Sequence, residues 1–193
     1  MKSRRLVSSW YLLGLIVGHL STPVAAAPAD LVFEYKGIRL GATEQQFRAK
    51  HPDFGCPTDP EIPDHRICSR RGATYADLEA QSTEAHFLRN RLSFIQVKFW
   101  SLDVSDVVDV IAQLEAALTE RYGKPHEGSP EWKREDPNMS IRSSNWYGQR
   151  SSMHVLTFWH IDKFAYETTF SIVLDGYWDE LFRMRAQRID KDI

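Results

Sequence analysis

Apolar and polar residues alternate along several short stretches of the chain, as they do in β-strands with one buried face. Between residues 31 and 36, for example, Leu31, Phe33 and Tyr35 fall on one side. We expect these stretches to form an antiparallel sheet. The remaining predicted strands cover residues 73–78, 84–88, 92–100, 145–149, 152–161 and 166–174, with a hairpin turn at 89–91.

The clearest helix lies at residues 103–122, where apolar side chains recur at steps of three and four residues. Aspartates in its first turns complement the helix dipole, and Gly123 ends it. This pattern predicts a helix with one face packed on the sheet. The apolar stripe consists of Val107, Ile111, Leu114 and Leu118.

Two shorter helices and one loop complete the pattern. Thr43 is a typical N-cap and Gln46 completes a capping box, so a helix of about two turns begins there. A closing helix is predicted at residues 178–188. Residues 124–142 are polar and rich in turn-forming residues, so we expect a long loop there.

Helices and strands are segregated along the chain rather than alternating, which favours an α+β fold. The expected architecture is an antiparallel sheet packed against one long helix and a short N-terminal helix. A small disulfide loop follows the short helix.

Residues 1–27 have the composition of a secretory signal peptide, with basic residues, then an apolar run, then small residues. The apolar run has about fifteen residues, whereas a membrane-spanning helix needs roughly twenty. We therefore expect cleavage between about Ala26 and Ala29. The mature protein is predicted to be periplasmic or secreted, with no stable membrane span after cleavage.

The predicted mature part, residues 28–193, has 166 residues, a length typical of a single domain that buries its own core. Without the three basic residues of the leader it carries 21 basic and 26 acidic residues, a formal charge of −5. Nucleic-acid binding needs a dense field of Lys and Arg that displaces counterions. The charge balance therefore argues against a nucleic-acid partner.

Both cysteines, Cys56 and Cys68, lie in a polar, proline-rich segment of the mature part. In an oxidising compartment such a pair predicts a disulfide. Metal binding is the alternative, because His51, Asp64 and His65 lie nearby. However, the chain has no C-x-x-C pair, the spacing that thiolate metal sites and redox catalysis share.

The motifs of common catalytic and cofactor sites are absent from the sequence, including G-x-S-x-G, G-x-G-x-x-G and the Walker lysine loop. His154 and His160 fall on one side of a predicted strand. Six residues at about 3.3 Å each place them about 20 Å apart, too far to share one ion. We therefore predict no catalytic residue, cofactor or metal, with a hydrolase lacking a recognisable motif as an alternative.

The chain is rich in aromatic residues, with six Trp, seven Tyr and ten Phe. Most should be buried, but the alternation of the hairpin strand leaves Trp100 outside the core. Placing Leu156 and Phe158 inside leaves Met153 and Trp159 outside in the same way. We expect Trp100, Trp159 and Met153 to form a candidate binding surface, unless the closing helix or the 124–142 loop covers that face.

A local resemblance covers about residues 35–70. The stretch from Gly37 to Phe47 (GIRLGATEQQF), followed by Cys56 and Cys68, resembles the repeat unit of the β-lactamase inhibitory protein family. It is also similar to the related small lipoprotein of the outer-membrane barrel-assembly machine. The resemblance implies a short helix on a small antiparallel sheet, a loop disulfide after the helix, and non-catalytic binding of a protein partner across a sheet face.

These inferences predict an exported, non-catalytic protein-binding module, such as an inhibitor, an immunity factor or an envelope assembly factor. Its expected partner is another envelope or extracellular protein. The alternative is a module that binds a small ligand or lipid, which an apolar cavity of several hundred Å³ would distinguish.

Overall fold

The computed structural model describes residues 31–57, 62, 64–136 and 138–189, and its centre is a seven-stranded antiparallel sheet in the order β3-β6-β7-β11-β10-β9-β8. Two smaller sheets of two strands each accompany it in the described part of the chain. The large sheet consists of β3 (His65–Arg71), β6 (Ser82–Leu88), β7 (Arg91–Ser101), β8 (Glu127–Asp136), β9 (Met139–Tyr147), β10 (Ser151–His160) and β11 (Ala165–Leu174). The small sheets pair β1 (Glu34–Tyr35) with β2 (Ile38–Arg39) and β4 (Thr74–Tyr75) with β5 (Leu78–Glu79).

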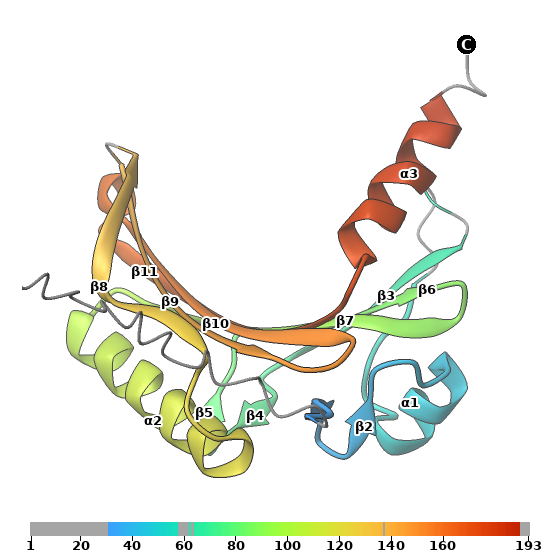
Figure 1. Ribbon diagram of the computed structural model, residues 1–193, viewed down its shortest axis with the longest axis horizontal. Helices are drawn as coiled ribbons and strands as arrows, with labels where there is room; N and C mark the ends of the chain where they lie inside the picture. The colour runs from blue at the N-terminus through green and yellow to red at the C-terminus, as the bar shows by residue number, and fades with distance from the viewer. Residues whose placement is uncertain (1–30, 58–61, 63, 137, 190–193) are drawn as a thin grey trace, which may run out of the picture.

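The large sheet is strongly curved, and the helices are distributed unequally over its two faces (Figure 1). Helices α1 (Glu44–Lys50) and α2 (Val104–Tyr122) lie on the convex side. Helix α3 (Tyr177–Ile189) rises from one end of the concave side, and the 3-10 turn η1 (Ile161–Lys163) joins β10 to β11. Between α3 and the β8–β9 hairpin, neither α1 nor α2 covers the concave face (Figure 1).

The predicted α+β class is wrong, because the fold is mostly β, with 47% of the described residues in strands and 27% in helices. The largest error is at residues 124–142, which form β8 and the first part of β9 instead of a loop. Strand β8 is an edge strand with register shifts against β9. A polar edge strand lacks the apolar alternation by which strands are recognised, so its composition resembled that of a loop.

Local capping explains where the helices begin and end. The predicted capping box of α1 is confirmed: Thr43 Oγ1 accepts from the Gln46 N–H, and the Gln46 side chain accepts from the Thr43 N–H. Asp103 caps α2 by accepting from the Ser105 N–H at 2.8 Å. Gly123 ends α2 with φ of 82°, a conformation that favours glycine.

The main core lies between the convex face of the sheet and the helices. The apolar stripe predicted for α2 is buried there. Trp146 of β9 is also fully buried, and its indole N–H donates to the carbonyl oxygen of Gly123 at 2.8 Å. From the other strands the core receives Cys68, Ala85, Ile95, Val97, Met153, Val155, Phe170 and Ile172.

A second, smaller apolar cluster lies on the concave side, under α3. It fixes the helix to one end of the sheet, and an ion pair of 2.7 Å between Arg89 and Glu180 adds a contact at its rim. The cluster consists of Ile62, Leu88, Phe94, Val173, Tyr177 and Leu181.

The predicted disulfide between Cys56 and Cys68 is present. It joins the segment after α1 to the edge strand β3, where Gly55 and Ser69 also exchange backbone hydrogen bonds of 3.0 and 2.8 Å. The predicted signal peptide, with its cleavage between Ala26 and Ala29, lies outside the described residues and stays a prediction. None of the helices that the structure describes is long and apolar enough to cross a membrane.

Candidate functional site: the concave sheet face

A continuous polar row crosses the concave face of the large sheet. Residues opposite one another in an antiparallel register project to the same side, so the strand pairing defines the row. Its members differ in charge and size, but all can form hydrogen bonds. From β3 to β8 the row reads Ser69, Glu84, Gln96, Ser171, His154, Asn145 and Glu127.

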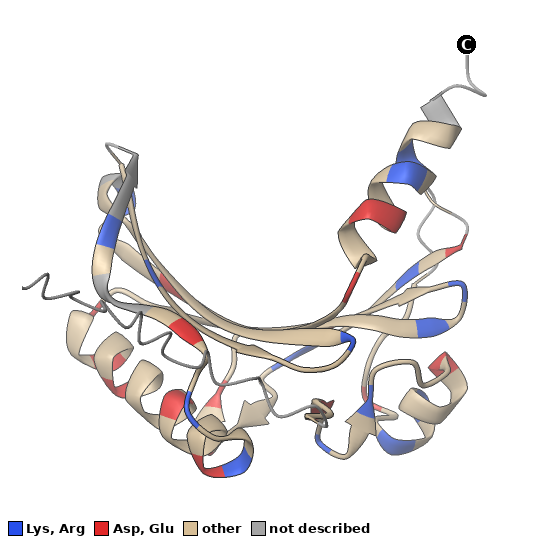
Figure 2. Cartoon of the chain, viewed as in Figure 1, with Lys and Arg blue, Asp and Glu red and all other residues tan. Residues whose placement is uncertain are grey.

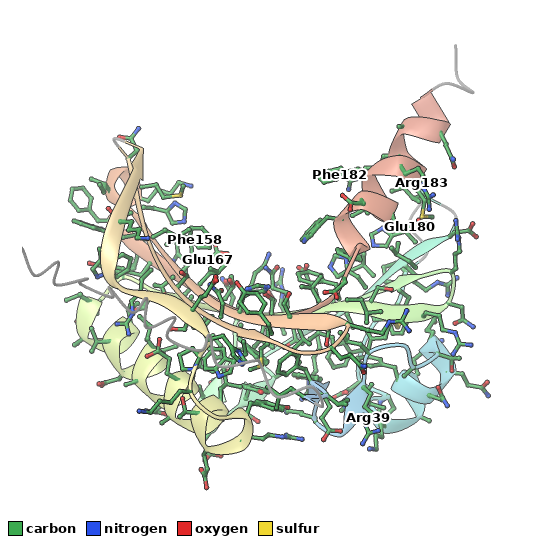
Figure 3. The ribbon with its side chains drawn as sticks, in the orientation of Figure 1. Arg39, Phe158, Glu167, Glu180, Phe182 and Arg183 are labelled. Carbon is green, nitrogen blue, oxygen red and sulfur yellow. A yellow bond between two sulfur atoms is a disulfide. The ribbon has the colours of Figure 1, made fainter. Side chains whose placement is uncertain are left out.

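Aromatic side chains flank this row on the side away from α3. Trp100 is 41% exposed, and its ring stacks on that of His160 at a centroid distance of 5.9 Å. His160 in turn lies 6.3 Å from the ring of Phe158. Figure 3 shows Phe158 and Glu167 on the open, concave side of the sheet. We call Trp100, Phe158 and His160 the sheet aromatic cluster.

Helix α3 carries exposed aromatic residues at the opposite end. Trp178 is 48% exposed and Phe182 is 58% exposed. The Trp178 ring lies 5.4 Å from Phe94 and 6.3 Å from Phe182, so the two exposed rings continue the apolar cluster under the helix. Phe182 lies on the side of α3 that faces the concave surface (Figure 3). The concave face therefore has aromatic groups at both ends, with the polar row between them.

Charges of both signs are interspersed over the sheet and α3 rather than gathered into a field of one sign (Figure 2). On the polar row, Glu84 lies 3.5 Å from His86 Nε2 and 3.9 Å from Lys98 Nζ. The hydrogen bond with His86, helped by the Lys98 ammonium, holds the pKa of Glu84 below its usual range.

Two members of the polar row, His154 and Asn145, form a hydrogen-bonded trio with Ser152. Asn145 Oδ1 and Ser152 Oγ each lie 2.8 Å from a ring nitrogen of His154, the first from Nδ1 and the second from Nε2. The amide oxygen accepts from Nδ1–H, so Nε2 accepts from the hydroxyl of Ser152. The order of groups is that of a nucleophile, a base and an orienting residue. Yet the backbone N–H groups of this central sheet region pair within the ladder and are not available as oxyanion donors.

The burial of His154 predicts a pH-dependent stability, because burial lowers the pKa of this imidazole. The unfolded chain binds a proton near the ordinary pKa of about 6.5, whereas the folded chain does so only at lower pH. The contribution is therefore complete above about pH 6.5 and is lost as the pH falls. His51, whose pKa burial also lowers, acts in the same direction.

Urea unfolding of the wild type should accordingly show a decreasing free energy of unfolding between pH 7.5 and 5. A His154→Gln variant should show a smaller decrease over the same range. An identical pH dependence in the two proteins would contradict the assignment.

The structure separates the residues predicted to form one binding surface. Trp100 is exposed on the concave face, as expected. The placement of Met153 is wrong, since it is fully buried in the main core. Trp159 lies on the convex side, half-buried, with its ring stacked on Tyr166 at 6.0 Å. The assumption that Phe158 faces inward is also wrong.

The error has a physical cause in β10, which carries apolar side chains on both faces. Alternation alone cannot say which set is buried in such a strand. The register with β11 decides, because Met153 pairs with Ile172 and Val155 with Phe170. The exposed pair on α3 was missed, although Trp178 and Phe182 are four residues apart in a predicted helix and therefore share a face.

The segment around the disulfide does not offer thiolate ligands. Glu44, Cys56 and Cys68 bring potential ligand atoms within 4.8 Å of one another, but both sulfurs are bonded to each other. His51 from the same region instead packs its ring against Phe47 at 5.0 Å.

A depression of about 520 Å³ extends the polar row onto the β3 edge of the sheet. Its lining is polar and charged, unlike the apolar cavity that a lipid-binding module would need. The lining residues are Ser69, Arg70, Arg71, Gln81, Ser82 and Glu84.

No protein-family model, curated protein or solved structure matches this chain. The resemblance of residues 35–70 to the β-lactamase inhibitory protein family therefore stays a prediction.

Proposed function

We propose that this chain is an exported, non-catalytic binding protein that holds a segment of a partner protein against its concave sheet face. The observation that carries the proposal is the distribution of the helices. Helices α1 and α2 both lie on the convex side, so the concave face is left uncovered between the sheet aromatic cluster and α3.

The chemistry of this face suits a protein segment. Exposed aromatic rings at each end supply the anchors that dominate protein interfaces, here Trp100 on one side and Phe182 on the other. The polar row between them can satisfy the backbone and side-chain groups of a bound segment. Seven strands at about 4.8 Å spacing make the sheet about 29 Å wide across its strands. A face of this width fits a protruding loop or helix better than a small molecule.

The partner that we propose is another envelope or extracellular protein. The Cys56–Cys68 disulfide supports an oxidising compartment, where such bonds form and persist. An inhibitor, an immunity factor and an envelope assembly factor would all use the face in this way.

Binding of the partner should depend on the aromatic residues of the concave face. We expect wild-type protein, coupled covalently to a resin, to capture the partner from envelope extract of the native host. A Trp100→Ala/Phe182→Ala variant should capture at least tenfold less, because interface hot spots cost about 2 kcal/mol or more each. Quantitative mass spectrometry identifies the partner, and titration with the purified partner then gives the change in Kd.

A matched control lies on the opposite side of the molecule. Val104 and Val108 are exposed on α2, so a Val104→Ala/Val108→Ala variant removes apolar surface from the convex side. It should bind as the wild type does. Equal capture by the concave-face variant and the wild type, with folding confirmed by circular dichroism, would exclude the proposed surface.

A further inference from the structure

Glu167 lies among the rings of the sheet aromatic cluster. In the strand register, Glu167 of β11 is directly opposite Trp100 of β7 on one side and Phe158 of β10 on the other. Directly opposite residues of an antiparallel pair have Cβ atoms about 4.5–5.5 Å apart and project to the same face. The carboxylate therefore lies between two aromatic side chains on the concave face, where Figure 3 shows Phe158 and Glu167.

The carboxylate of Glu167 has no hydrogen bond or ion pair with any residue that the structure describes, although the side chain is half-buried. Other glutamates on the concave side do have partners. Glu84 contacts a lysine at 3.9 Å and a histidine at 3.5 Å, Glu127 accepts from a tyrosine hydroxyl at 2.8 Å, and Glu180 pairs with two arginines. Glu167 therefore differs from these three in its electrostatic surroundings.

The cationic side chains nearest in the strand register do not neutralise Glu167. Lys98 lies two residues before Trp100 on β7, and its ammonium contacts another glutamate. Lys133 of β8 belongs to the same row of the register, but Ile141 of β9 and then Phe158 of β10 lie between it and Glu167. A partly desolvated charge without a partner costs free energy, and the negative faces of aromatic rings do not stabilise an anion.

A cation bound above Glu167 would be attracted by all three side chains. Aromatic faces attract a cation that lies within about 6 Å of the ring centroid. Trp100 and Phe158 are two strand spacings apart, about 9.6 Å, so a cation midway between them lies within this range of both. Trp100 is also 41% exposed, which leaves its ring accessible to a partner. Arginine suits this arrangement best, because its planar guanidinium stacks on aromatic rings and donates two parallel hydrogen bonds to a carboxylate.

We propose that Glu167, Trp100 and Phe158 receive an arginine side chain of the partner segment. The carboxylate accepts hydrogen bonds from the guanidinium, and the two rings flank it. This inference rests on the proposed function, because it names the residue that the bound segment brings to the concave face. It adds a chemical requirement that the aromatic anchors alone do not impose on the partner.

A titration that does not need the partner tests the site directly. N-acetyl-L-arginine methylamide, added to ¹⁵N-labelled wild-type protein, should give a saturable shift of the Trp100 indole resonance, which a Trp100→Phe variant identifies. The neutral analogue N-acetyl-L-citrulline methylamide and a Glu167→Gln variant should each show binding about tenfold weaker, because hydrogen bonds between charged groups are the strong ones. Absence of a saturable shift, equal binding of the two probes, or tighter binding of N-acetyl-L-lysine methylamide would overturn the proposal.

Capture of the partner from envelope extract tests the same carboxylate in the complex. Glu167→Gln should capture about tenfold less than the wild type. It should not lower the midpoint of urea unfolding, because the charge has no partner within the described chain. Glu120→Gln, which removes the same charge from an exposed position of α2 on the convex side, should capture as the wild type does.

The capture results also separate this inference from the proposed function. If Glu167→Gln captures as the wild type does while Trp100→Ala/Phe182→Ala does not, the arginine site is excluded and the proposed function stands. If neither variant loses capture, the proposed function fails and the arginine site fails with it.

Discussion

Replacement of Trp146 by alanine is expected to lower the free energy of unfolding by about 3–5 kcal/mol. The side chain is fully buried on the convex side of β9, so its removal leaves a cavity between the sheet and α2. It also removes the hydrogen bond of 2.8 Å to the Gly123 carbonyl, which belongs to the residue that ends α2. Urea unfolding at neutral pH measures the loss, with far-ultraviolet circular dichroism as the probe because its signal comes from the backbone rather than from tryptophan.

Two tryptophan controls separate the contributions. Trp146→Phe keeps most of the buried volume but lacks the indole N–H, so we expect a smaller loss of about 1–3 kcal/mol. Trp132 is exposed on β8, and Trp132→Ala should change the free energy of unfolding by no more than about 0.5 kcal/mol. Similar losses for Trp146→Ala and Trp132→Ala would contradict the assignment of Trp146 to the core.

The elements that sequence reasoning predicted well are those determined by local chemistry. The capping box at Thr43 and the glycine at residue 123 act within a few residues of themselves, so they can be recognised without tertiary structure. The turn between β6 and β7 is similar, because Arg89 and Asn90 adopt φ of 49° and 61° in a two-residue hairpin connection. The stripe on α2 was also clear because its period is helical throughout.

The errors arose where distant parts of the chain decide the outcome. Strand β8 is stabilised by pairing with β9 rather than by its own apolar residues, so nothing local marked residues 124–142 as a strand. The buried face of β10 depends on its register with β11, which placed Met153 in the core and Phe158 on the concave side. The contacts that His86 makes with His65 and Tyr177 likewise join residues up to 112 positions apart in the chain. No sequence motif connects them.

The candidate site could be predicted only in part for the same reason. Trp100 was assigned to the outside correctly, because the apolar alternation of β7 identifies its buried face. Whether other aromatic residues accompany it depends on the curvature of the sheet and the position of α3. The aromatic part of the site is therefore a property of the assembled sheet, with residues contributed by β7, β10 and α3.

Loss of the disulfide is expected to lower the free energy of unfolding by about 2–3 kcal/mol. Cys56 and Cys68 are 12 residues apart, and closing a loop of this size restricts the unfolded chain by about that amount. The bond also holds the segment of Phe54, which packs its ring on Phe47 of α1, against the edge strand β3. Urea unfolding with and without dithiothreitol should show the difference directly.

A Cys56→Ala/Cys68→Ala variant provides the matched control, because it has no bond to reduce. Its midpoint in urea should lie close to that of the reduced wild type and should not respond to dithiothreitol. The buried position of Cys68 adds a small packing loss in the variant, so it should be the less stable of the two by up to about 1 kcal/mol. If reduction leaves the stability of the wild type unchanged, the loop is held in place by the Gly55–Ser69 pairing and the aromatic contacts of Phe54 rather than by the covalent bond.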